Sequence, residues 1–261
     1  MIESERVAAI VAELAEAERT REPIERLTKR FPEMTVEDAY TVQGEWRRAH
    51  EEAGRRLVGR KIGLTSRAMQ MATGITEPDY GIIFRDMVRD NAEIYEWDKF
   101  VFPRVEVELA FTLEKDLEGP DLTLLDAIDA IGWMTPSLEI LDSRVELEGR
   151  TIVDTISDNA AMHSMVIGGR PVRLQDADPR WVGAALYVNQ GIEETGLGAG
   201  VLNHPAAGVQ WLANKIAAHG DKLHAGEIIL AGSFTRPVPA KKGDSFVADF
   251  GPLGTVTCRF V

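Results

Sequence analysis

The stretch RVEVELAFTL (residues 104–113) alternates apolar side chains with a second series that contains two glutamates. Successive side chains of a β-strand point to opposite faces, so this period of two predicts a strand. Its apolar face would carry Val105, Val107, Leu109, Phe111 and Leu113. Glu106 and Glu108 would then share the other face, where two like charges repel each other.

The glutamate face allows two interpretations. A solvated edge strand would present the same pattern, but this face continues with the small residues Ala110 and Thr112, which do not resemble an exposed surface. A third carboxylate, Glu139, lies between apolar neighbours in LEIL (residues 138–141). A buried carboxylate is costly unless it is paired or binds a metal. Three carboxylates without a Cys or His partner suit a hard cation, Mg²⁺ or Mn²⁺.

Two further segments offer catalytic candidates. Lys61 lies in the glycine-flanked segment GRKIGLTS (residues 59–66), where its ammonium could bind an anionic substrate or stabilise developing charge. A surface lysine in a turn is the alternative. Asp79, in EPDYG (residues 77–81), is a candidate acid or base, although an aspartate in such a loop more often simply forms the turn.

Substrate-binding candidates follow a predicted strand near the C-terminus. In GSFTR (residues 232–236), the hydroxyls of Ser233 and Thr235 could bind a carboxylate, or could equally end the strand. Arg236, beside them, is a candidate cation for an anionic substrate, as are Lys241 and Arg85, and an ordinary exposed charge is the alternative for each.

The remaining pattern predicts a mixed α/β protein. Residues 1–56 read as a helical segment, with a break at Pro23 and a capping box that begins at Thr35. Residues 57–261 alternate short strands, turns and a few helices, which indicates a catalytic domain with a mainly antiparallel sheet. The two parts form separate units or one continuous domain. Asp158 and Asn159 are expected to cap a helix.

Composition excludes several classes of protein. Lys and Arg number 29 against 42 Asp and Glu, and a net charge of −13 argues against nucleic acid or an anionic membrane as partner. The single cysteine, Cys258, cannot form an intrachain disulfide. We find neither a signal-peptide pattern nor an apolar run of membrane-spanning length. These features predict a cytoplasmic protein.

Taken together, the motifs resemble the hydratase and decarboxylase group of the fumarylacetoacetate hydrolase superfamily, whose members act in meta-cleavage catabolism of aromatic compounds. The similarity extends from about residue 31 to the C-terminus. Its segments are KIGLTS (61–66), EPDYG (77–81), PRVEVELAF (103–111), LEILDSR (138–144), SDNAA (157–161), VLNHPAAGVQWLANK (201–215) and GSFTRPVPAKKGD (232–244). The combination of these segments is specific, whereas any one of them alone is not.

The resemblance implies a fold, a site and an activity. It implies a β-roll of the fumarylacetoacetate hydrolase type, with Glu106, Glu108 and Glu139 as the metal ligands. Lys61 would bind or stabilise substrate charge, and Asp79 would transfer protons. It also implies large homo-oligomers, and association with a partner enzyme of the pathway in some members.

By this resemblance, the expected reaction is addition of water to a 2-hydroxy-2,4-dienoate or 2-oxo-enoate acid, with the seven-carbon 2-oxohept-4-ene-1,7-dioate as the favoured substrate. Arg236, Lys241 or Arg85 would then pair with its second, distal carboxylate. Three alternatives stay open. The substrate could be a penta- or hexa-2,4-dienoate, the reaction could be decarboxylation of 4-oxalocrotonate, or the chain could be a catalytically silent metal-binding partner subunit.

Overall fold

A computed structural model describes residues 2–66, 70–71 and 77–261, and shows the expected mixed α/β architecture. In this part of the chain the strands form a nine-stranded sheet and a five-stranded sheet. The larger sheet runs in the order β2-β1-β11-β5-β6-β7-β3, with β12 beside β5 and β8 beside β6. Most neighbouring strands are antiparallel, as expected, and β1·β11, β3·β7 and β14·β4 are parallel.

The predicted strand is β5 (Arg104–Leu113), and it lies inside the larger sheet. β11 (Ile228–Ser233) pairs with one of its edges and β6 (Ile131–Leu141) with the other. The five apolar side chains of β5 are buried in the main core. The edge-strand interpretation is therefore wrong, and the glutamates lie on an interior strand.

A hairpin-like pair extends the sheet beyond β11. β1 (Leu57–Gly63) runs parallel to β11 and antiparallel to β2 (Asp79–Phe84). Asp79 consequently opens a strand and pairs with Gly63, instead of forming a turn. The other strands of this sheet are β3 (Val88–Asp90), β7 (Met162–Ile167), β8 (Val172–Arg173) and β12 (Val238–Pro239).

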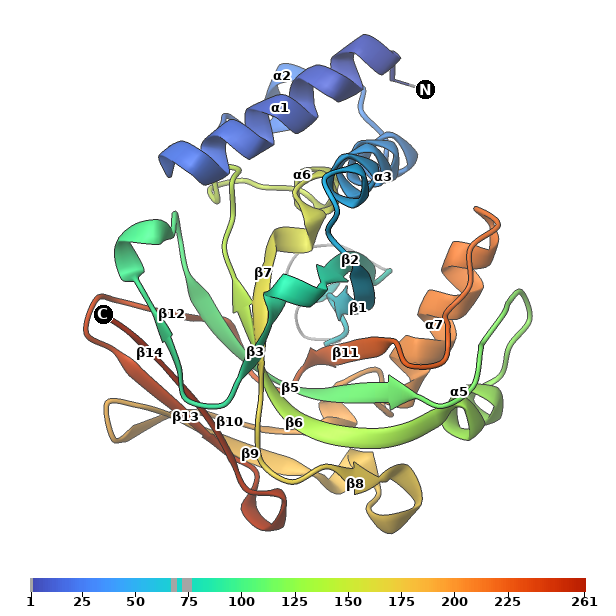
Figure 1. The fold of residues 1–261 in the computed structure, drawn as a ribbon, viewed down its shortest axis with the longest axis vertical. Coiled ribbons are helices and arrows are strands. Elements are labelled where there is room, and N and C mark those ends of the chain that lie inside the picture. The colour runs from blue at the N-terminus through green and yellow to red at the C-terminus, as the bar shows by residue number, and fades with distance from the viewer. Residues whose placement is uncertain (1, 67–69, 72–76) are drawn as a thin grey trace.

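The five-stranded sheet packs below the larger one in the view of Figure 1. Its order is β10-β9-β13-β14-β4. The strands are β4 (Glu93–Tyr95), β9 (Gly183–Val188), β10 (Gly191–Leu197), β13 (Ser245–Asp249) and β14 (Thr255–Phe260). Phe246, Phe260 and Leu186 of these strands are fully buried in the core shared with the larger sheet. Cys258 is buried in β14.

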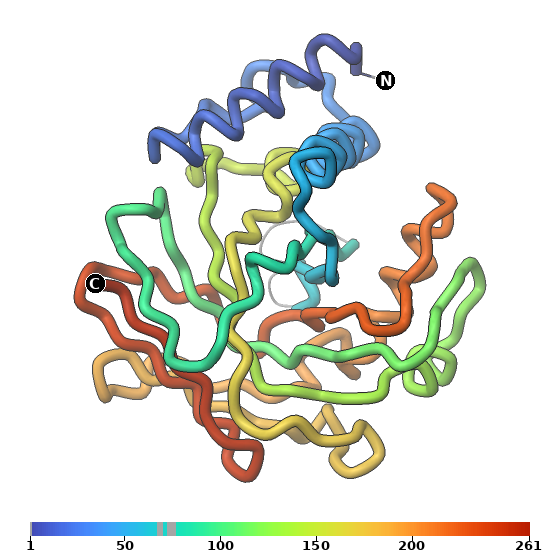
Figure 2. Tube along the Cα trace, viewed as in Figure 1, coloured from blue at the N-terminus to red at the C-terminus, as the bar shows by residue number. Residues whose placement is uncertain are grey.

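The N-terminal helices gather at one end of the molecule (Figure 2). α1 (Ser4–Thr20) and α2 (Leu27–Arg30) are separated around Pro23, as the proline predicts, and α3 (Val36–Glu52) begins with the predicted capping box at Thr35. The later helices are α5 (Leu124–Ala130), α6 (Ile152–Ser157) and α7 (Ala206–Ala217). Within the described residues, no helix is both long enough and apolar enough to cross a bilayer.

The helical segment is joined to the rest of the chain by packing and by backbone pairing. Ile24 N–H donates to Arg144 O at 2.9 Å, and Glu146 N–H donates to Ile24 O at 3.0 Å. Ile10 and Leu14 of α1 pack in one apolar cluster with Val145 and Ile156, while Trp46 of α3 belongs to the main core. This packing fixes the position of α6 and of the turn that follows it.

The SDNAA turn after α6 holds the edge of β2. Asn159, Ala160 and Ala161 all have positive φ angles, between 49° and 58°. The Asn159 side chain accepts from Ile82 N–H at 2.7 Å and donates to Ile82 O at 3.0 Å. Asp158 forms a buried ion pair with Arg144. The expectation that Asp158 and Asn159 cap a helix through their side chains is therefore wrong, because their polar atoms bind Arg144 and β2.

We predict that Asn159→Ala lowers the free energy of unfolding by about 2–4 kcal/mol, since it leaves both backbone groups of Ile82 buried without partners. Urea denaturation followed by circular dichroism measures this. The matched control is Asn91→Ala, because Asn91 also bonds backbone groups but is exposed. Water can replace those bonds, so its loss should stay below about 1 kcal/mol. Equal losses in the two variants would contradict the role of Asn159.

Candidate active site and metal centre

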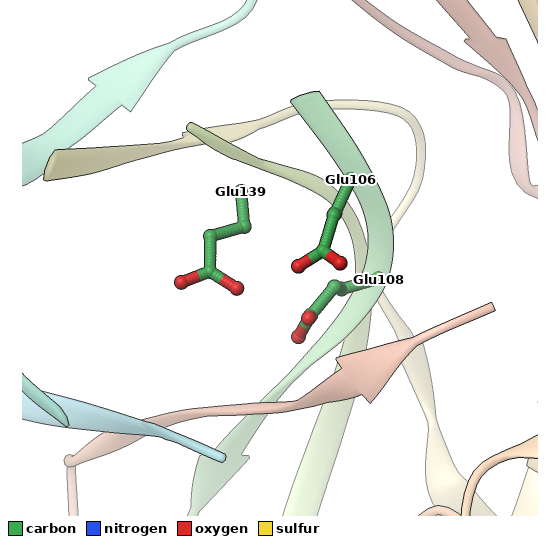
Figure 3. A group of neighbouring side chains, drawn as sticks. All are labelled: Glu106, Glu108 and Glu139. Carbon is green, nitrogen blue, oxygen red and sulfur yellow. The ribbon is translucent and has the colours of Figure 1, made fainter. Parts of the chain in front are cut away.

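The sheet register brings the three predicted glutamates together. Glu106 and Glu108 point from one face of β5, and Glu139 lies directly opposite Glu106 on β6. Figure 3 shows the three carboxylates gathered on one side of these strands. Each offers an oxygen within 4.8 Å of the other two. Like charges directly opposite each other destabilise a sheet, so this arrangement needs a neutralising partner.

The buried surroundings of the three glutamates increase the need for a neutralising partner. Glu108 and Glu139 are each 1% exposed, and both oxygens of Glu139 lack a hydrogen-bond donor among the described residues. Burial, followed by the charge of Glu139, raises the pKa of Glu106 to about 7 and raises that of Glu108 well above its usual range. Oxygen ligands that are crowded, buried and short of donors fit a hard divalent cation.

A bulge in β11 orients Glu108. The register between β11 and β5 shifts between Leu230 and Ser233, and the amide of Gly232 donates to Glu108 Oε2 at 2.9 Å. Gly232 has φ 113°, and a Cβ there would lie 2.1 Å from Thr65 Oγ1. This position therefore requires glycine, and the GSFTR segment orients the candidate metal ligand Glu108 in addition to carrying hydroxyls.

Lys61 on β1 and Asp79 on β2 lie beside the three glutamates. Lys61 is 4% exposed, and its Nζ lies 3.3 Å from Glu139 Oε1. Burial alone would lower the pKa of Lys61, but the charges of Glu139 and then Asp79 outweigh it and raise the pKa, so the ammonium stays charged. The surface-lysine alternative is therefore wrong.

Asp79 is 1% exposed, and both of its carboxylate oxygens lack hydrogen-bond partners among the described residues. Burial raises the pKa of Asp79, although the charge of Lys61 opposes that shift. A Cβ on Gly63 would lie 2.1 Å from Asp79 Oδ1, so glycine opposite Asp79 makes room for the carboxyl group. A buried carboxyl group with a raised pKa suits proton transfer.

These residues line one cavity of about 410 Å³, a size typical of small-molecule sites. Lys61, Asp79, Glu106 and Glu108 all contribute to it. Its walls include the apolar side chains of Ile62, Leu64, Leu141 and Ile152. The cavity can therefore hold an acid with a short hydrocarbon chain.

Only two of the three predicted substrate-binding residues lie at the cavity. Ser233 and Thr235 line the cavity, whereas Arg236 does not. Its side chain is 78% exposed and pairs with Glu194. The Ser233 hydroxyl donates to Thr235 O at 2.9 Å, which shapes the turn. The Thr235 hydroxyl accepts from Val107 N–H at 3.4 Å and lies 3.4 Å from Ser233 Oγ, so its proton can turn to Ser233 or to a ligand.

Two arginines that we did not predict also line the cavity, Arg104 and Arg150. Arg104 opens β5 on the same face as Glu106 and Glu108, so the period of two in the sequence could have predicted its position beside them. Arg150 precedes α6 in a loop, and no sequence pattern places it near the glutamates.

Comparisons with known proteins agree with this geometry. The family model described as fumarylacetoacetate (FAA) hydrolase C-terminal matches residues 70–261. The chain is 50% identical to 2-oxo-hept-4-ene-1,7-dioate hydratase of Escherichia coli, over 97% of each chain. It is 37% identical to 2-keto-4-pentenoate hydratase of Paraburkholderia xenovorans, over 95% of this chain and 92% of the relative.

A similar solved structure is 4-oxalocrotonate decarboxylase from Pseudomonas putida G7, complexed with magnesium and adipate. The TM-score is 0.97 at 35% identity, and the match covers 100% of this chain and 99% of that one. With this agreement of sequence, fold and site geometry, the chain belongs to the fumarylacetoacetate hydrolase family.

Proposed function

We propose that this protein is a divalent-metal-dependent hydratase that adds water to a 2-hydroxy-2,4-dienoate or 2-oxo-enoate acid, with 2-oxohept-4-ene-1,7-dioate as its substrate. The observation that carries this proposal is one cavity lined by Lys61, Asp79, Glu106 and Glu108, with Glu139 crowded against the two glutamates. The 50% identity to a hydratase of that dioate supports the choice of substrate.

The residues take distinct roles in this reaction. Glu106, Glu108 and Glu139 would hold the cation, Mg²⁺ or Mn²⁺. When bound, such a cation supplies a Lewis acid that polarises the substrate's C2 oxygen. Lys61 holds a second positive charge beside the glutamates and stabilises negative charge that develops on the substrate.

Proton transfer and orientation fall to other side chains. Asp79 faces the cavity without a competing hydrogen bond from the described residues, so it can hold and deliver a proton. The Thr235 hydroxyl is placed to donate to a substrate carboxylate. The apolar residues of the cavity lining can pack against the carbon chain of the substrate.

The decarboxylase alternative shares the scaffold, because a 4-oxalocrotonate decarboxylase superposes with a TM-score of 0.97. One experiment separates the candidates. Ultraviolet assays with the five-, six- and seven-carbon dienoates and with 4-oxalocrotonate, followed by product identification, distinguish hydration from loss of CO₂. Turnover of none of these acids by the metal-loaded protein would leave the silent partner subunit as the better interpretation.

The assembly and the location expected from the sequence remain predictions. We expect a homo-oligomer in the cytoplasm, alone or with an enzyme of the same pathway. Light scattering of the purified protein measures the number of subunits.

Glu106→Gln should lower Mg²⁺ affinity at least about 100-fold and abolish turnover, because it removes one anionic ligand. Calorimetric titration with Mg²⁺ measures the affinity. The metal-free variant should unfold at no lower temperature than wild type, since one charge has left a repelling cluster. The control Glu37→Gln changes an exposed glutamate of α3 and should alter neither quantity. Full activity of Glu106→Gln, or of exhaustively chelated wild type, would refute the metal site.

Lys61→Met should reduce kcat/KM by roughly 10²–10³-fold, the usual effect of losing one preorganised donor to a developing oxyanion. Mg²⁺ affinity should rise, because the variant removes a cation that lies 3.3 Å from Glu139 Oε1. Steady-state kinetics and metal titration give the two values. A loss of activity below about threefold would make Lys61 a bystander.

Asp79→Asn should reduce kcat by about 10²–10⁴-fold while leaving Mg²⁺ binding in place. Because burial raises the pKa of Asp79, the proton is retained to higher pH than in an ordinary aspartate. If Asp79 donates that proton, wild-type kcat falls as pH rises through this raised pKa, and the residual activity of Asp79→Asn lacks that fall. Identical pH–rate profiles for the two proteins would remove Asp79 from proton transfer.

A further inference from the structure

The cavity contains two cations beyond Lys61, and neither belongs to the metal cluster or to the proposed proton transfer. Arg104 opens β5, two residues before Glu106 and on the same face. Arg150 precedes α6 and reaches the same cavity from the loop. Burial, followed by the charge of Arg104, lowers the pKa of Arg150, which agrees with two guanidinium groups lying close to each other.

Arg104 and Arg150, both half-buried, differ from the buried Arg60 and Arg144 in having no carboxylate partner among the residues that the structure describes. Arg60 pairs with Asp221 and Glu227, and Arg144 pairs with Asp158. Arg104, by contrast, has Nε and Nη2 buried without a hydrogen-bond acceptor among the described residues. Burying a guanidinium without partners is costly, so its donors point to an anion that binds there.

Arg150 is in a similar position. Its Nη1 donates to Ser143 Oγ at 2.9 Å, a neutral acceptor. Of the carboxylates nearby, Asp158 binds Arg144 and Asp154 accepts from Thr28 and Thr151, while Asp79 forms no ion pair with Arg150 within the described residues. The charge of Arg150 is therefore also left for a ligand.

The length of the substrate also fits. The terminal carbons of a seven-carbon acid are separated by six bonds, and six bonds of an extended backbone, two residues, span about 7 Å. Two residues of β5 separate Arg104 from Glu106, which is also about 7 Å along the strand. An acid held at the glutamates by its C1 carboxylate would thus present its C7 carboxylate near Arg104, with Leu141 beside its carbon chain.

We propose that Arg104 and Arg150 bind the distal carboxylate of the substrate and make the enzyme selective for a dioate. This inference rests on the proposed function, and it replaces Arg236 as the residue that recognises the second carboxylate. Arg236 is exposed and already paired with Glu194.

The test compares Arg104→Gln and Arg150→Gln on two substrates. Each variant should lose about 10- to 100-fold in kcat/KM on the seven-carbon dioate, mostly through KM, since a charged hydrogen bond is removed. On 2-hydroxypenta-2,4-dienoate, which has no distal carboxylate, the loss should stay below about threefold. Arg104→Lys keeps the charge and should recover part of the dioate activity. Arg48→Gln, an exposed arginine of α3, controls for the change in net charge.

Several outcomes overturn the proposal. Equal losses on both substrates would make the arginines structural, and absence of any loss would make them bystanders. A dioate-selective loss in Arg236→Gln, with Arg104→Gln unaffected, would restore the assignment from the sequence. A wild-type preference for the five-carbon acid would remove the need for a distal site.

A binding measurement distinguishes this proposal from the proposed function. Calorimetry of the Mg²⁺-loaded protein should show that pimelate, the saturated seven-carbon dicarboxylate, binds more tightly than heptanoate, and that Arg104→Gln abolishes the difference. If wild type hydrates neither the seven-carbon dioate nor 2-hydroxypenta-2,4-dienoate but still binds pimelate more tightly than heptanoate, the hydratase proposal fails and the arginine site stands. If wild type hydrates the dioate but binds pimelate and heptanoate equally, the arginine site fails alone.

Discussion

The repulsion between Glu106 and Glu139 is the constraint on which the site depends. These two glutamates lie directly opposite each other in the interior of a sheet, and Glu108 adds a third charge two residues away. A sheet tolerates such a contact only with a compensating cation. Lys61 supplies one positive charge at 3.3 Å from Glu139, and a bound divalent cation would supply the rest. The crowding that weakens the metal-free sheet is thus what makes the site bind a cation.

Other parts of the fold hold this arrangement in place. The β11 bulge places the Gly232 amide on Glu108, and the parallel pairing of β1 with β11 brings Lys61 next to the same cluster. β2 adds Asp79 opposite Gly63, and the Asn159 side chain holds the edge of β2. The N-terminal helices fix α6, and with it the turn that carries Asn159. The charged centre therefore rests on long-range packing, in agreement with the rule that precise sites stand on rigid elements.

The sequence alone predicted what local periodicity encodes. The period of two in β5 identified its buried face and the common face of Glu106 and Glu108, and the capping box at Thr35 was found where the motif predicts it. Cross-strand register is set by distant pairing, so residue type and family resemblance grouped Glu139 with Glu106, but neither predicted that the two lie directly opposite each other. Arg236 was favoured because it neighbours Ser233 and Thr235, yet neighbouring side chains of an extended segment point in opposite directions. The same alternation puts Arg104 on the face of Glu106 and Glu108, and it would have identified Arg104 as a cation beside them.

The positions of these charges suggest how one scaffold serves several acids. The hydratases and the decarboxylase to which this chain is similar have names that differ in chain length and in reaction, while the fold changes little, with a TM-score of 0.97 to the decarboxylase. The two hydratase names share a 2-oxo acid end, which in our proposal binds at the glutamates and Lys61. The length of the substrate's carbon chain has to be recognised further from the glutamates, by Arg104 at the start of β5 and Arg150 in the loop before α6. Two arginines that have no carboxylate partner within the described residues and line the same cavity are energetically costly. Recognition of a second carboxylate accounts for that cost, whereas catalysis at the C1 end alone does not.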